Sequence, residues 1–359
     1  MRYTNRLGVG IKYPDKVIFA FCPQLVELTG AKSLTDSVEF SVGGRNITVP
    51  VYSDTLRVDI STLVQLLFGD MRDASAMASR YKQFTVIIKY GSGSLLFAFP
   101  CIAIWGAIEP LGRVGQYGLI HFDRSTYMYK RSVRWFKAFP FGVEFITDTN
   151  YEVQQSVDGG AYGSPRGLTT IGIHREDISS LAQYKSVVRV RPQDRSNVWD
   201  GTFDFTFSNI VEYYVQEYSV TVDERTNGYY MRWIDGSGLM QYYLFDGGTD
   251  AVKTSDTGTT SIGIEAGGFT YNEGARVYGK TKEHSKKICA TMIPEDEQAL
   301  VQSIGESIMC DMYAGKDNAG RHLWLPVIVK SSTLSVRECR GMQDIEIEIE
   351  IPSGAVQRL

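Results

Sequence analysis

Residues 344–351 read Asp-Ile-Glu-Ile-Glu-Ile-Glu-Ile. Because successive side chains of a β-strand point to opposite faces of a sheet, the isoleucines would share one face and the glutamates the other. We therefore predict a strand with one aliphatic and one acidic face. Three carboxylates in a row would also protect a sheet edge from aggregation. A fully hydrated acidic face is the simpler interpretation, and contact with a basic partner is the alternative.

Apolar and polar residues also alternate with period two in many other segments of the chain. Residues 38–42 and 47–51 flank Gly43-Gly44, which predicts a hairpin whose turn needs positive φ. Residues 84–90 and 95–99 flank a Gly-Ser-Gly-Ser turn and predict a second hairpin. The whole apolar run 95–107 is predicted as a pair of buried strands. Further strands are predicted at residues 133–146 (bent at Pro140), 152–157, 203–207, 213–222, 229–234 and 239–245.

Two segments carry the helical period instead. Residues 59–68 (DISTLVQLLF) begin with capping residues and then place leucines on one side. Residues 294–309 begin with Pro294 and three acidic residues, which suit the positive end of a helix dipole. Residues 246–268 are rich in glycine and threonine, and we predict a long loop there.

These patterns predict a mainly β protein with two or more β-sandwich-like or barrel-like domains and a few short inserted helices. A chain of 359 residues exceeds what one hydrophobic core usually serves. The polar, turn-forming stretch 192–200 is the best boundary. We therefore expect an N-terminal β-rich domain at residues 1–200 and a C-terminal β-rich domain at residues 201–359, with the 294–309 helix in the second.

Composition limits the classes of partner and compartment. The formal net charge of −4 argues against a nucleic-acid coat protein and against sequence-specific nucleic-acid binding. The first residues lack the apolar core of a secretion signal, and no apolar run spans a bilayer, so no membrane partner is expected. Five scattered cysteines without Cys-x-x-Cys spacing are interpreted as small buried hydrophobes in a reducing cytoplasm.

The sharpest chemical motif is GARVYGKT, which matches the P-loop expression from Gly274 to Thr281. In a P-loop, backbone amides and Lys280 would hold phosphates while Thr281 would hold magnesium. That mechanism needs a buried strand before the loop and a helix directly after it, and the sequence before Gly274 does not read as a buried strand. We favour a β-hairpin through Gly279 and assign no cofactor. Nucleotide binding by Gly274, Gly279, Lys280 and Thr281 is kept as an alternative.

Other motifs carry weaker signals, and we assign neither catalytic residues nor a metal site. Residues 246–250 (DGGTD) could bind calcium weakly but lack the EF-hand ligand pattern. Aromatic strands at residues 135–136 and 229–233 could stack sugars, although core packing explains them more simply. A carbohydrate-binding module therefore stays as a second alternative. The four histidines lie far apart and outside any HExxH motif: His121, His174, His284 and His322.

Six short segments carry a resemblance to a known class of proteins: residues 58–68 (VDISTLVQLLF), 135–141 (WFKAFPF), 230–236 (YMRWIDG), 242–246 (YYLFD), 303–307 (SIGES) and 324–329 (WLPVIV). In this order they resemble virion structural proteins of tailed bacteriophages, in particular tail or baseplate components from phages of gut anaerobes.

The resemblance implies a non-enzymatic structural protein of the virion, assembled in the cytoplasm of the bacterial host. It implies β-sandwich or barrel domains, and it brings no catalytic residue. The implied partners are copies of the same chain in a ring and other tail or virion proteins. The expected function is therefore a ring-forming tail or baseplate component that joins neighbouring virion proteins, with a distal-tail or hub adaptor as the first choice.

Overall fold

The computed structural model describes residues 2–69, 75–91, 93–107, 121–123, 128–147, 150–192, 216–266, 269–330 and 341–351. Strands dominate these residues and the helices among them are short, which confirms the prediction of a mainly β protein. The chain forms two compact units: unit 1 is Met1–Arg225 with Ile234–Gln241, and unit 2 is Thr226–Trp233 with Tyr242–Leu359. The predicted boundary after residue 200 lies outside the described residues, in the part of the chain assigned to unit 1.

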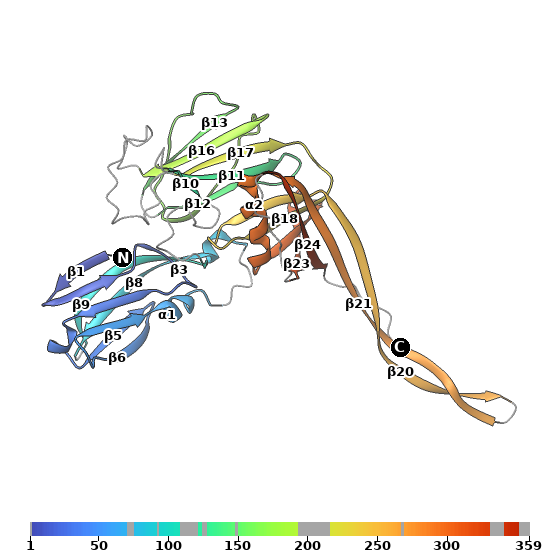
Figure 1. The fold of residues 1–359 in the computed structure, drawn as a ribbon, viewed down its shortest axis with the longest axis horizontal. Helices are drawn as coiled ribbons and strands as arrows, with labels where there is room; N and C mark the ends of the chain where they lie inside the picture. The colour runs from blue at the N-terminus through green and yellow to red at the C-terminus, as the bar shows by residue number, and fades with distance from the viewer. Residues whose placement is uncertain are drawn as a thin grey trace. The chain divides into compact units, whose positions relative to one another are not determined.

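Two sheets at the start of unit 1 enclose one hydrophobic core (Figure 1). Val26 and Leu28 from one sheet and Phe40 and Ile88 from the other are fully buried in it, as the period-two pattern requires. The strand orders are β1 (Arg2–Arg6), β2 (Val9–Tyr13), β4 (Leu25–Thr29), β7 (Thr55–Asp59) and, in the second sheet, β3 (Val17–Phe19), β9 (Ser94–Ile104), β8 (Tyr81–Tyr90), β5 (Ser37–Val42), β6 (Arg45–Pro50).

Both predicted hairpins of this region are confirmed. Gly43 and Gly44 have φ of 57° and 81°, the left-handed values that a two-residue turn between β5 and β6 requires. The run 95–107 was expected to form two strands, and this prediction is wrong, since β9 is continuous through Pro100. Pro100 precedes the part of β9 that pairs with β3, so its missing N–H removes no hydrogen bond to that strand.

The rest of unit 1 contains a six-stranded and a two-stranded sheet. The predicted strand 133–146 is wrong as a single element, because it is divided between β11 and β12 in different sheets. The backbone turns at the break, where the N–H of Phe139 donates to the carbonyl of Phe136 at 2.9 Å just before Pro140. The orders are β10 (His121–Asp123), β11 (Met128–Phe136), β17 (Gln216–Asp223), β16 (Lys185–Pro192), β13 (Tyr151–Val157), β14 (Arg166–Leu168), and β12 (Val143–Thr147) with β15 (Gly172–Glu176).

The helices of unit 1 are single turns. The helix predicted at residues 59–68 is present as α1 (Ser61–Gln65). The carboxylate of Asp59 accepts hydrogen bonds from the backbone N–H groups of Ser61 and Gln24, each at 2.9 Å, and so ties the start of the helix to the segment before β4. Two 3₁₀ turns, η1 (Ala31–Ser33) and η2 (Met77–Ser79), complete this set.

A seven-stranded sheet, most of it in unit 2, forms the second half of the fold. Its face against α2 (Glu295–Gln302) and the 3₁₀ turn η5 (Ser303–Glu306) is apolar. Trp233 is fully buried there, and its indole N–H donates to the hydroxyl of Ser303 at 2.8 Å. The strand order is β19 (Met240–Phe245), β18 (Tyr229–Ile234), β22 (Cys310–Lys316), β23 (His322–Val329), β24 (Gln343–Ile351), β21 (Phe269–Ile293) and β20 (Gly247–Ala266).

The strand predicted at residues 344–351 is confirmed as β24. Ile345, Ile347 and Ile349 are buried and the glutamates between them are exposed or half-exposed. The helix predicted at residues 294–309 is confirmed over a shorter range, since it tightens into η5 after Gln302. The loop predicted at residues 246–268 is wrong: Gly247–Ala266 is the strand β20, in which threonine, a β-branched residue, is frequent.

No helix among the described residues is long and apolar enough to cross a membrane.

The two faces of β24 give a direct test of the fold. Ile347→Ala should lower the free energy of unfolding by about 2–5 kcal/mol, because the side chain is 1% exposed and its removal leaves a cavity. Glu346→Ala, one residue earlier with a side chain 61% exposed, should change it by less than about 0.5 kcal/mol. Urea unfolding of both variants measures the difference, and equal effects would contradict the described orientation of β24.

Candidate assembly surface

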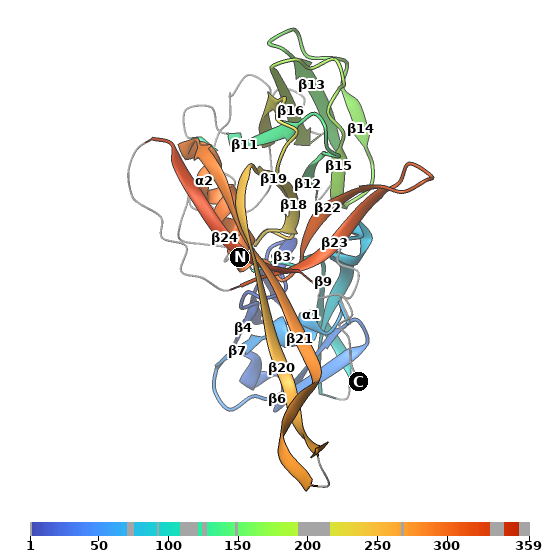
Figure 2. The ribbon, with the colours of Figure 1, turned by 90° about the vertical axis from the view of Figure 1, so that its right-hand side faces the viewer.

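Strands β20 and β21 form an antiparallel ribbon that extends beyond the rest of their sheet. They pair from Gly247 with Cys289 to Ala266 with Phe269. The next strand, β24, accompanies β21 only as far as His284. In the described part of the chain, no third strand pairs with the ribbon beyond that point. Figures 1 and 2 show β20 and β21 running side by side along its length. A two-stranded ribbon is marginally stable in water by itself, so contact with another surface would stabilise it.

The edges of the ribbon are suited to such contact. β20 is the last strand of the sheet order, so its outer edge has no neighbouring strand among the described residues. Unpaired strand edges are templates for pairing with another chain. The register is regular from Gly247 to Asp256 and shifts at three places between Asp256 and Ile264. Such irregularities increase local twist, so the base of the ribbon is regular and its outer part is twisted.

The P-loop-like residues belong to this ribbon. The chain remains a strand to Ile293, and α2 begins only at Glu295. P-loop phosphate binding needs a loop that opens directly into a helix, and the backbone here is an extended strand instead. The four residues Gly274, Gly279, Lys280 and Thr281 pair in register with Ile262, Gly258, Asp256 and Ser255 of β20.

The four histidines lie on separate strands. His174, in β15, stacks on Phe145 with 5.8 Å between ring centres, and burial lowers its pKa. His322, in β23, has Nδ1 at 3.1 Å from the hydroxyl of Tyr313. His121 and His284 lie in β10 and β21. Among the described residues, no group of three or more His, Cys, Asp or Glu side chains is arranged to hold a metal ion.

Residues of β21 bond to the carboxylates of residues 246–250, the segment considered above as a weak calcium site. A carboxylate oxygen of Asp246 accepts a hydrogen bond from the hydroxyl of Thr291 at 2.8 Å, and Asp250 forms an ion pair with Lys286. The ammonium of Lys286 also lies 4.9 Å from the ring centre of Tyr229. These contacts join β21 to the start of β20 and to β18 at the base of the ribbon.

An aromatic cluster lies on the sheet of unit 2. The rings of Tyr313 and Trp324 meet edge-to-face with centres 5.3 Å apart. The guanidinium of Arg232 lies 4.2 Å from the Trp324 ring centre and bonds to Asp311 at 2.7 Å. One face of the Trp324 indole is therefore covered by a cation that is itself held in position. Tyr230 and Trp233, which sequence analysis considered for sugar stacking, are buried, and Phe136 is also buried.

A buried ion pair lies in the centre of unit 1. Arg80 and Glu144, both nearly inaccessible to solvent, form two parallel bonds of 2.7 and 2.8 Å. Arg80 also donates to the carbonyl of Gly238 at 2.8 Å, and Glu144 accepts the backbone N–H of Met240 at 2.6 Å. The pair therefore holds the backbone of the turn at residues 234–241.

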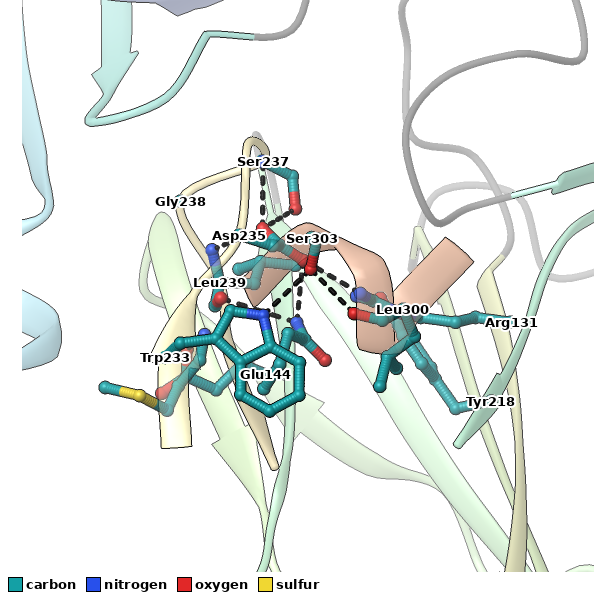
Figure 3. A network of polar contacts seen from close by, with 12 residues as sticks. Arg131, Glu144, Tyr218, Trp233, Asp235, Ser237, Gly238, Leu239, Leu300 and Ser303 are labelled. Atoms are coloured by element: carbon teal, nitrogen blue, oxygen red, sulfur yellow. Dashed lines mark hydrogen bonds and ion pairs between the residues drawn. The ribbon is translucent and has the colours of Figure 1, made fainter. Parts of the chain in front are cut away.

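A second buried pair holds the same turn (Figure 3). Arg131 bonds to Asp235 at 2.8 Å, and both side chains are buried. The other oxygen of Asp235 accepts the backbone N–H groups of Ser237 and Leu239 at 2.8 and 3.1 Å. Gln241 donates to Asp235 at 2.8 Å. Because these charges bond to one another and to the backbone, we interpret both pairs as structural elements.

The loop between β15 and β16 exposes Leu181 and Tyr184. The carboxylate of Asp158, which has φ of 48°, accepts the backbone N–H groups of Lys185, Tyr184 and Gln183 at 2.8–2.9 Å. These hydrogen bonds lower the pKa of Asp158. The loop is thereby tied to the end of β13.

The cysteines agree with their interpretation as small hydrophobic residues. Cys22, Cys101 and Cys310 are buried and Cys289 is half-buried, all as free thiols. Burial raises the pKa of Cys101 and of Cys310 to about 12, which keeps both thiols protonated and unreactive. Cys339 lies outside the described residues.

The ribbon and the buried ion pairs were not predicted from the sequence. The alternation of β20 is carried by threonine, serine and glycine, so it shows no apolar period. Its signal is the frequency of β-branched threonine in residues 247–266. Arg80 and Glu144 lie 64 residues apart, and no local pattern connects them.

Comparisons with known proteins give no family. The sequence matches no protein-family model and no curated protein. Among solved structures, a chain described as "Cytokine receptor complex - Crystal form 2" is similar at 12% sequence identity, covering 51% of this chain and 90% of that one. Its TM-score of 0.15 is too low to support an argument about fold or function.

The structural role of the buried pair can be tested by a double-mutant cycle. Arg80→Met should cost about 3–5 kcal/mol of unfolding free energy, because it leaves the charge of Glu144 buried without a partner. Adding Glu144→Leu should recover part of that loss, because the unpaired charge is removed while the N–H of Met240 and the carbonyl of Gly238 lose these partners. A matched control is Arg57→Met, which removes an exposed pair with Glu27 of the same 2.7 Å length and should cost less than about 1 kcal/mol. Equal costs for Arg80→Met and Arg57→Met would contradict the structural role.

The Asp158 contacts predict a pH dependence. The pKa of Asp158 in the folded chain lies below its unfolded value of about 3.9, so the carboxylate stabilises the fold above that value. This stabilisation is lost as the pH falls through the folded-state pKa. Asp158→Asn should therefore lower the thermal midpoint at pH 7, and the difference from wild type should shrink as the pH approaches 3. A difference that is independent of pH would exclude this role for the ionised carboxylate.

Proposed function

We propose that this chain is a non-enzymatic structural subunit that assembles with copies of itself and with neighbouring proteins in a phage tail or baseplate. The observation that carries the proposal is the β20–β21 ribbon, which continues past the end of β24 as two strands alone. The bacteriophage assignment rests on the resemblance of the six segments, from residues 58–68 to 324–329. The place of action is the virion, assembled in the host cytoplasm.

A projecting two-stranded ribbon needs stabilising contacts beyond its own strand pairing. From residue 253 to residue 283 its two strands have only each other as described strand neighbours. Isolated hairpins gain little from pairing alone and become stable when a further strand or a packed surface covers them. A second protein surface supplies both the missing hydrogen-bond partners and the packing. The ribbon is therefore a suitable element for reaching a neighbouring subunit.

The same ribbon is compatible with a ring of copies. A projecting arm that contacts a different surface of the next copy makes a heterologous contact. Repetition of such a contact closes into a ring when the rotation between copies allows it. Ring formation is the assembly that the resemblance implies, and a ribbon of this kind provides one way to achieve it.

Removal of the ribbon tests the proposal. Because Val252 and His284 are register partners, residues 253–283 can be replaced by Asn-Gly, which closes a two-residue hairpin at that pair. The wild-type chain should form rings or concentration-dependent oligomers in light scattering and negative-stain microscopy, without any nucleotide. The shortened chain should remain monomeric with an unchanged thermal midpoint, since all pairs of β21 with β24 are kept.

A matched control shortens another hairpin in the same way. Lys316 and His322 are register partners, so residues 317–321 can also be replaced by Asn-Gly. This variant should assemble like the wild type. A wild-type chain that stays monomeric at its highest soluble concentration, or a ribbon-deleted chain that still assembles, would contradict the proposal.

A further inference from the structure

We propose that lysines at the base of the ribbon bind the acidic face of β24 in a second copy of this chain. The inference rests on the proposed self-assembly and names the two surfaces that would meet. The lysines are Lys280 and Lys282 of β21, and the acidic face is formed by Asp344, Glu346, Glu348 and Glu350 of β24.

The lysines occupy alternate positions of a regular strand. The register between β20 and β21 is continuous from the pair Asp256–Lys280 to the pair Gly247–Cys289. Residues two apart in such a strand share a face and repeat about every 6.4–6.8 Å. Lys280 stands opposite Asp256 in the register, whereas Lys282 stands opposite the uncharged Thr254. Lys282 is therefore the main cationic position of this face.

The acidic face has the same repeat and an excess of negative charge. The four carboxylates of β24 on this face have two lysine neighbours in the ion pairs that the structure describes for β24. Lys330 bonds to Glu348 at 2.9 Å, while Lys287 lies 3.8 Å from Glu346. The strand partner of Glu350 on β23 is Ile328, which is 65% exposed. The face therefore offers carboxylates and exposed apolar surface to a partner with cations at the same strand spacing.

The two surfaces face opposite ways at the base of the ribbon. Lys286 is the register partner of Ile349, which is buried, whereas Glu348 is the partner of Lys287 on the other face. Lys280 and Lys282 continue the period of Lys286 past the end of β24, whose pairing stops at His284. By register, Lys280 and Lys282 therefore occupy the face of the ribbon opposite to the acidic face of their own chain, and a neighbouring copy can supply that acidic face. Each copy then gives lysines to one neighbour and receives them from another, which is a heterologous contact.

Charge reversal on each surface tests this contact. The variant K280E/K282E should weaken self-association at least about tenfold in sedimentation velocity at low salt, because like charges then meet. The variant E346K/E350K should do the same, and it keeps the Lys330–Glu348 pair. An equimolar mixture of the two variants should regain association, because each restores the opposite charge on its partner. Added salt should weaken the wild-type assembly. Lys316→Glu, the same charge change at the tip of β22, should have no effect.

The outcomes distinguish failure of the proposed contact from failure of the proposed function. Circular dichroism and the thermal midpoint should match wild type for all variants. If ribbon deletion abolishes assembly while both charge-reversed variants assemble normally, the proposed function stands and this contact is wrong. Failure of the mixture to regain association also overturns it. If K280E/K282E instead assembles normally but loses binding of a single-stranded DNA oligonucleotide that the wild type binds, the lysines serve nucleic acid and the contact is again wrong.

Discussion

The pairing of β24 with β21 is the interaction on which unit 2 and its ribbon depend. Ile347 and Ile288 are direct register partners, and both are buried on the sheet face that also carries Ile345 and Ile349. Burial of each such side chain contributes about 1.5–3 kcal/mol. A marginal two-stranded ribbon is thereby continuous with the final part of β21, from His284 to Ile293, which pairs with β24. The rest of the ribbon can extend beyond the sheet because its root is held by the core.

Unit 1 adds buried ion pairs to its hydrophobic core. A bidentate ion pair such as Arg80–Glu144 contributes little net stability over an apolar pair of the same volume, since both charges lose their hydration. Its geometric effect is different. The two groups together fix a backbone carbonyl and a backbone N–H of the 234–241 turn, and Arg131 with Asp235 fixes the rest of that turn. These pairs define the conformation of one segment, which a non-directional apolar contact would not do.

The sequence predicted the elements in which large apolar residues recur at the spacing of a strand or a helix. β24, the hairpin at Gly43-Gly44 and α2 were found because isoleucine, valine and leucine recur at the spacing of a strand or a helix. β20 was predicted as a loop because its alternation is among threonine, serine and glycine, which do not separate into buried and exposed kinds. Residues 133–146 were predicted as one strand because the aromatic run continues across Phe139 and Pro140, while only the three-dimensional turn divides it. The ion pairs required knowledge of contacts 64 and 104 residues apart.

The register shifts of the ribbon lie in its outer part, which indicates that the base and the outer part have different roles. A long, flat, unpaired edge favours uncontrolled strand addition, and natural proteins counter this with bulges and charged residues. Here the register shifts are confined to the outer part, between Asp256 and Ile264, while the base from Gly247 to Asp256 is regular. Twist in the outer part would prevent indefinite edge-to-edge stacking of ribbons. A regular base keeps residues of one kind in line at a fixed repeat, which specific recognition by a neighbouring strand requires. The geometry thus suits a defined contact between subunits better than open aggregation.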